Sequence, residues 1–277
     1  MNKTLKGTLD VLWFFITFFL IQLLFLWSTA IVLTLSHGAF SFHNFTVELA
    51  SIPLDGRLLA LSGALSSVTT LLVFFRLKWA DASNAYLATR PWGTIAWAVL
   101  LALGALIPLE WLYEQLGMSM PAAQEQLLRR ILSEPWGYLA VGILAPWAEE
   151  AVFRGAILRT LLRFFPGKRH WLAIVLSALL FALAHGNNAQ GLHALLMGLL
   201  MGWMFYRTNS IVPGIVLHWT NNTVSYILYN LMPQLPDGKL IDLFHGSHQL
   251  LLAAVFFSLC IFVPSLFQLS LRMKRGE

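Results

Sequence analysis

The chain has 277 residues, of which 58% are hydrophobic and only 11% are charged. Soluble domains carry about 25% charged residues, so this composition excludes an ordinary soluble protein and predicts an all-α polytopic membrane protein. The formal net charge of +5 comes from basic residues that flank apolar segments, which is typical of a topology signal and not of a nucleic-acid-binding surface. Since no long hydrophilic stretch is present, we predict a single integral membrane domain over residues 1–277.

About eight apolar segments are candidates for transmembrane helices, each of which needs about 20 mostly apolar residues. They cover residues 9–35, 58–77, 92–113, 136–162, 171–185, 191–206, 211–231 and 250–271. The fifth and sixth segments are short, so we expect them to be tilted, stacked or bent. Residues 124–132 are expected to form either a short amphipathic helix at the interface or a helical extension of the fourth segment that Pro135 interrupts. Loops are expected over residues 36–56 and 233–246.

The distribution of basic residues predicts the topology. If the N-terminus lies inside, thirteen lysines and arginines fall on the inside and four on the outside, while Arg154 lies within a segment. Because positive charge gathers on the cytoplasmic side, this asymmetry favours eight spans with both termini cytoplasmic. We expect the membrane to be a bacterial cytoplasmic membrane.

Three charged residues, Glu149, Glu150 and Arg154, lie within six positions of the fourth segment. A charge at the centre of a bilayer costs at least about 2.5–3.5 kcal/mol, so such residues mark functional sites by default. Glu150 and Arg154 have the i,i+4 spacing of a helical ion pair. Glu149 points about 100° away from Glu150 and can face a polar intramembrane cavity. The alternative is a structural salt bridge that fastens helices together.

Further polar side chains occur in the next segments. His185 ends the fifth segment, and His218 and Asn222 lie on one face of the seventh. With Glu149 they supply a carboxylate, two imidazoles and an amide, which suffice for a general base and an oxyanion hole. Hydrogen bonding between helices is the structural alternative. His193, near the start of the sixth segment, is the histidine nearest in sequence to the candidate site, and we expect it to stand apart from the site and to have no catalytic role.

Signatures of other membrane hydrolases are missing from the sequence. No HExxH motif provides two metal ligands and a base on one helix, and no Gly-x-Ser-Gly offers a serine nucleophile. The apolar segments contain no pair of aspartates. If the protein is a hydrolase, a glutamate is therefore the residue left to activate water.

Three motifs resemble those of a known family. EEAVFR at 149–154 is similar to the family motif EExxxR, FALAH at 181–185 to FxxxH, and HWTNN at 218–222 to HxxxN. Their order and spacing resemble the CPBP or Abi family, the CAAX prenyl proteases and bacteriocin-processing enzymes, which are intramembrane glutamate proteases. The motif-bearing core covers about residues 136–231, and the other segments match only in being hydrophobic.

The resemblance implies an eight-helix fold with a conical cavity and an enzyme that needs no metal or other cofactor. By analogy, Glu149 and His185 activate a water molecule, His218 and Asn222 stabilise the tetrahedral oxyanion, and Glu150 with Arg154 holds the geometry of the site. A straight helical layout puts His185 near the outside and His218 near the cytoplasm. The fifth segment must therefore be tilted or displaced to bring them together.

The sequence predicts an intramembrane endopeptidase that cleaves peptide bonds near the membrane in a membrane-associated peptide or protein. The first alternative is a zinc-dependent version with Glu149, His185 and His218 as metal ligands. The second is a non-catalytic membrane scaffold or immunity protein with the same fold. A transporter is less consistent, because we find no inverted repeat. The identity of the substrate, its prenylation, any regulating partner and the oligomeric state stay open.

Overall fold

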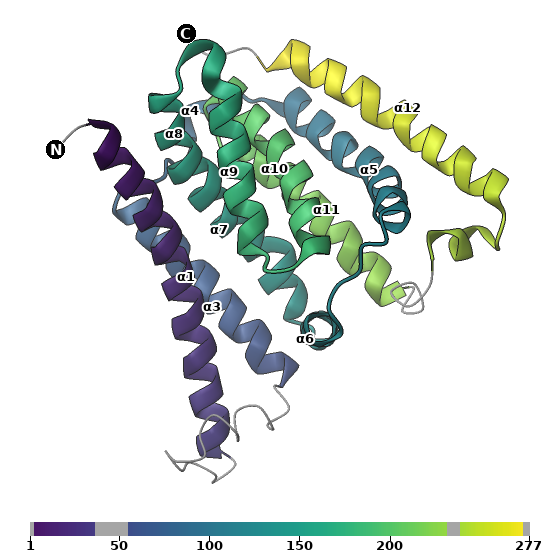
Figure 1. Cartoon of the computed structure of the whole chain (residues 1–277), viewed down its shortest axis with the longest axis horizontal. Helices are drawn as coiled ribbons and strands as arrows, with labels where there is room; N and C mark the ends of the chain where they lie inside the picture. Colours follow the sequence, from purple (N-terminus) through teal and green to yellow (C-terminus); the bar gives the residue numbers. More distant parts are fainter. Residues whose placement is uncertain (1–2, 37–54, 232–238, 274–277) are drawn as a thin grey trace.

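The computed structural model describes residues 3–36, 55–231 and 239–273, and every regular element in these residues is a helix (Figure 1). The long α-helices are α1 (Lys3–Ser36), α3 (Gly56–Arg76), α5 (Trp92–Gln115), α9 (His170–Ala184), α10 (Asn188–Thr208), α11 (Val212–Leu231) and α12 (His248–Arg272). The short ones are α4 (Asn84–Ala88), α6 (Ala122–Leu132), and the 3-10 turns η3 (Gly167–Arg169) and η5 (Leu240–Phe244). Residues 37–54 of the first expected loop and 233–238 of the second lie outside the described residues. The described part of the second loop contains η5.

Each of the eight apolar segments coincides with a long helical stretch, so the expected all-helical fold is confirmed. Five helices are long and apolar enough to cross a membrane by length and composition: Leu5–Val32, Gly56–Arg76, Trp92–Gln115, Gly167–Ala184 and His248–Arg272. The segments that contain the polar motifs are helical too, but α10 and α11 are less apolar, and the fourth segment is divided into several stretches.

The helices with the motifs lie between two outer pairs (Figure 1). α1 packs beside α3 on one side, and α5 packs along α12 on the other. The outward faces of these pairs carry exposed apolar side chains, such as Leu24 on α1 and Phe257 on α12. Such large exposed apolar faces suit contact with lipid and would be unfavourable in water. α9 also presents exposed apolar side chains, such as Leu183, so the outer pairs cover the central helices only in part.

Residues 138–164 form one continuous helical segment with two widened parts. It consists of a π-helix η1 (Tyr138–Leu144), α7 (Ala145–Glu150), a second π-helix η2 (Ala151–Leu158) and α8 (Arg159–Phe164). π-helical turns are rare and occur mostly at functional sites. The sequence predicted one apolar helical segment here, and the structure shows a change in its hydrogen-bond register on both sides of the glutamates.

A proline explains how the first π-helix is linked to α11. In η1 a carbonyl accepts from the N–H five residues later, as Ala140 does from Ala145. The next carbonyl in this register, that of Val141, faces Pro146, which has no N–H. Asn222 on α11 satisfies it instead, because its Nδ2 donates to Val141 O at 3.0 Å. The unpaired carbonyl thus fixes α11 against the segment.

α9 has only 15 residues, so it is about 22 Å long and shorter than the roughly 30 Å hydrocarbon core. It begins beside the end of α10, where the ring of His170 stacks on Tyr206 with centroids 3.9 Å apart. It ends at His185, and Gly186 follows with φ of +69°, a conformation that suits glycine. His185 therefore lies directly at the C-terminal end of a short helix.

Candidate active site

Glu150 and Arg154 form a buried ion pair. Arg154 Nη1 lies 2.5 Å from Glu150 Oε1, and the two side chains are 1% and 0% exposed. Arg154 Nη2 also donates to the carbonyl of Gly198 on α10 at 3.3 Å, and the guanidinium lies 4.5 Å from the centre of the Phe181 ring on α9. The arginine therefore joins α9 and α10 to the segment that carries both glutamates.

Gly214 on α11 lets that helix approach Glu150 closely. A Cβ atom at this position would lie 2.6 Å from Glu150 Oε2, so any larger residue would collide with the carboxylate. Glu150 Oε2 has no hydrogen-bond partner in the part of the chain that the structure describes. The buried carboxylate is therefore satisfied through its other oxygen, by the arginine.

His218 on α11 lies between the two carboxylates. Its Nε2 is 3.7 Å from Glu149 Oε2, and its Nδ1 is 3.7 Å from Glu150 Oε1. Both distances are too long for hydrogen bonds but short enough for strong attraction when the imidazole carries a proton. Glu149 differs from its neighbour in exposure, since its side chain is 21% exposed. The two adjacent glutamates thus have clearly different surroundings.

His185 approaches the cluster through Phe181. The ring of Phe181 lies 4.8 Å from that of His185 and 5.8 Å from that of His218, centroid to centroid. His185 Nδ1 lies 2.9 Å from the Phe181 carbonyl, which can only accept, so Nδ1 holds the proton and Nε2 keeps its lone pair in the neutral ring. Among the described residues, no hydrogen bond or ion pair joins His185 to Glu149.

Asn222, the fourth predicted catalytic residue, is anchored as described above. Its Nδ2 donates to Val141 O, and its Oδ1 accepts from Asn221 Nδ2 at 3.3 Å. An amide nitrogen carries two hydrogens, so one N–H of Asn222 is left for another acceptor. Asn222 therefore makes the hydrogen bond between helices that was the structural alternative. Its second amide N–H is still available as a donor.

His193 lies near the start of α10, which packs along α9. Its Nδ1 lies 3.0 Å from the hydroxyl of Tyr113 on α5. These contacts do not test the expectation that His193 stands apart from the site, which stays a prediction. Eight residues of sequence separate it from His185, but the short turn between α9 and α10 brings the two back together.

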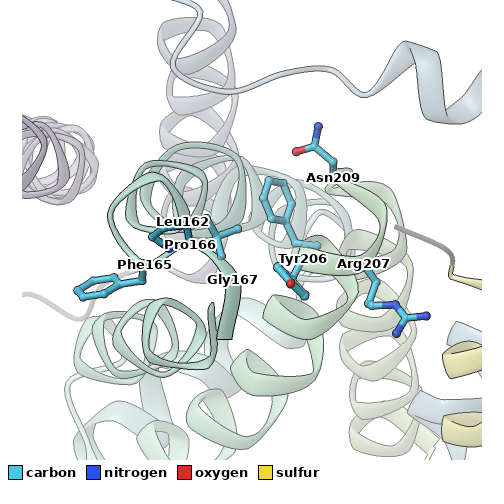
Figure 2. Close-up of a pocket in the computed structure, with 8 residues that line it drawn as sticks. Leu162, Phe165, Pro166, Gly167, Tyr206, Arg207 and Asn209 are labelled. Atoms are coloured by element: carbon cyan, nitrogen blue, oxygen red, sulfur yellow. The ribbon is translucent and has the colours of Figure 1, made fainter. Parts of the chain in front are cut away.

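A pocket of about 280 Å³ lies away from the predicted site, at the junction of α8, η3 and the end of α10 (Figure 2). Its lining contains none of the predicted catalytic residues. Arg207 at its rim is held by the carbonyls of Met273 and Ser270. In the described ranges, no three His, Cys, Asp or Glu side chains are grouped so as to hold a metal ion.

Sequence reasoning missed two contributors to this site. Gly214 and the Val141 carbonyl act only through contacts between segments. In the sequence, Pro146 is the residue that could have indicated the unpaired Val141 carbonyl. A proline inside a helical apolar segment has no N–H, so a carbonyl of the preceding turn needs another donor. For Gly214, the Pro213–Gly214 pair gives only a weak indication that another helix approaches closely.

The helical fold and the buried charged cluster define an integral membrane protein with a polar centre. Residues 131–224 match the family model of the Rce1-like type II CAAX prenyl endopeptidases. The matched region contains all three motifs, so the resemblance to the CPBP family is confirmed, and the match supports a CAAX-type intramembrane protease at the level of the family. Comparison of the chain with curated proteins and with solved structures found no match.

Proposed function

We propose that the protein is an intramembrane endopeptidase in which Glu149 activates the attacking water. The observation that carries this proposal is the contrast between the two glutamates. Glu150 has no exposed surface and is bound by Arg154, whereas Glu149 is 21% exposed and faces His218. A carboxylate that is accessible and not neutralised by an arginine is the better general base.

In this mechanism Glu149 takes a proton from water while the oxygen of that water bonds to the carbonyl carbon of the peptide. The free lone pair of His185 Nε2 accepts the second hydrogen of the water and orients it. The intermediate then collapses, its C–N bond breaks, and the proton held by Glu149 passes to the departing amine. A new acid and a new amine are the products.

His218 and Asn222 are the proposed donors to the oxyanion of the intermediate. His218 lies 3.7 Å from each of two carboxylates, and its imidazole carries at least one N–H donor in either charge state. The remaining N–H of Asn222 supplies a second donor. Preorganised donors of this kind each contribute about 10²–10³ to turnover.

Two alternatives predict different results. A zinc enzyme with Glu149, His185 and His218 as ligands would lose activity with a chelator and regain it with zinc. A membrane scaffold or immunity protein would show no turnover and would not depend on Glu149. The ion pair of Glu150 and Arg154 suits all three functions, but the accessible carboxylate beside His218 favours hydrolysis, because a scaffold has no need for it.

The substrate can be found by comparing membranes that contain the wild-type protein with membranes that contain Glu149→Ala. We expect a small set of membrane-associated proteins or peptides to accumulate uncleaved in the variant, and mass spectrometry of their termini to define the cleaved bond. Cleavage of the same substrate by purified protein should continue in the presence of a chelator. Identical peptide termini in the two membranes would contradict the proposal.

The proposed topology has eight spans with both termini in the cytoplasm. Each of the eight apolar segments coincides with a long helical stretch, and the distribution of basic residues favours an even number of spans. Reporter fusions at Asn2 and at Glu277 should therefore both report the cytoplasm, and a fusion within residues 36–56 should report the outside. Reporters on opposite sides would require an odd number of spans and would rule out this topology.

A further inference from the structure

Tyr113 and His193 form a hydrogen-bonded pair beside the proposed site. Tyr113 lies near the end of α5 and His193 near the start of α10, with the hydroxyl 3.0 Å from Nδ1 and the ring centroids 5.8 Å apart. Both side chains are partly buried. The pair therefore joins two helices that come from different parts of the sequence.

The start of α10 returns along the end of α9. A Cβ atom at Gly191 would lie 3.4 Å from the carbonyl of Ala182, so the backbones of the two helices are close at this level. His193 follows two residues later on α10, which packs along both α9, the helix that ends at His185, and α11, the helix that carries His218. Three imidazoles from α9, α10 and α11 thus gather around one region of the bundle.

The contact between Tyr113 and His193 allows two tautomers of the imidazole, and one of them leaves a donor on the other ring nitrogen. In this tautomer the hydroxyl of Tyr113 donates to Nδ1 of His193, 3.0 Å away. The neutral imidazole then carries its own proton on Nε2, and that N–H has no acceptor among the described residues. His193 is consequently a donor held in a fixed orientation without an acceptor of its own.

A substrate inside a membrane needs such donors. A peptide that leaves water loses the hydrogen bonds to its backbone carbonyls, and an unpaired carbonyl in an apolar environment is strongly unfavourable. An intramembrane protease must therefore supply N–H groups along the bound segment. His218 and Asn222 serve the carbonyl that is attacked in the proposed mechanism, which leaves the other carbonyls of the segment without a donor.

We propose that His193, oriented by Tyr113, donates its Nε2 hydrogen to a backbone carbonyl of the bound peptide next to the cleaved bond. His193 is then a substrate-positioning residue, and the ligand of this subsite is the main chain of an extended peptide, independent of its side chains. This inference rests on the proposed protease function.

Steady-state kinetics of the purified full-length protein on a quenched fluorescent, prenylated CAAX peptide tests the inference. His193→Ala should raise KM about tenfold, the effect of one lost hydrogen bond, with kcat within about twofold of wild type. His193→Gln should recover most of the wild-type KM, because its amide again presents an N–H. Tyr113→Phe should give a smaller rise, because the ring keeps its donor but loses its fixed orientation.

His248→Ala is the matched control, because this histidine is exposed at the start of α12, and its KM should equal that of wild type. An unchanged KM in His193→Ala, or a collapse of kcat at constant KM, would overturn the inference. A thermal melt of each variant verifies that it is folded, and His193→Gln decides the outcome if His193→Ala is not. A wild-type protein that cleaves neither this peptide nor any accumulating membrane protein contradicts the proposed function itself, and the inference then falls with it.

Discussion

Replacing Glu149 with glutamine is expected to reduce peptide hydrolysis by about 10²–10⁴-fold while the thermal stability of the protein stays nearly unchanged. Glutamine has almost the same size and shape but cannot accept a proton from water. Stability is retained because Glu149 is partly exposed and its contact with His218 is 3.7 Å long. Turnover of the substrate and the melting temperature are the two measurements.

Glu150→Gln is the matched comparison, since it makes the same chemical change one residue away. Here the loss should fall on stability, because the substitution leaves Arg154 buried without its counter-charge. If Glu149→Gln retains ordinary activity, or if both substitutions have the same effect on the melting temperature, the proposed division between the two glutamates is wrong.

Arg154→Ala is expected to destabilise the protein by roughly 3–5 kcal/mol, the typical loss when one partner of a buried ion pair is removed. Three effects act together. The Glu150 carboxylate loses its counter-charge, the Gly198 carbonyl loses a donor, and the Phe181 ring loses the cation above it. Unfolding in a denaturing detergent or by heat, monitored by helical circular dichroism, measures the difference.

A second i,i+4 pair in the same protein provides the control. Arg129 and Glu125 on α6 lie 2.7 Å apart, but their side chains are 27% and 34% exposed. Because solvent screens such a pair, Arg129→Ala should cost no more than about 1 kcal/mol. An Arg154→Ala protein as stable as Arg129→Ala would show that the buried pair does not hold the helices together.

The sequence predicted well what depends on local pattern. Runs of apolar residues located every long helical stretch, and the i,i+4 spacing of Glu150 and Arg154 predicted their pairing. These features follow from hydropathy and from helix geometry, which act within one segment. The roles of the individual site residues stay predictions until the variants are measured.

Features that depend on contacts between segments could not be predicted from the sequence. The depth of His185 depends on where α9 stops, and the approach of Gly214 to Glu150 depends on the packing of α11. The position of His193 depends on the turn at Gly186. The sequence shows only that His193 and His185 are eight residues apart. It does not show that α10 turns back and packs along α9.

The bond between Val141 and Asn222 also bears on the order in which the protein assembles. Val141 precedes Asn222 by 81 residues, so the Val141 carbonyl is synthesised, and can enter the bilayer, before Asn222 exists. An unsatisfied carbonyl in hydrocarbon costs several kcal/mol, and water or lipid headgroups can serve it only near the interface. The packing of α11 removes this penalty, so the helix that carries the last motif has a specific contact point on the earlier segment. The proposed catalytic residues come together only when α11 packs there.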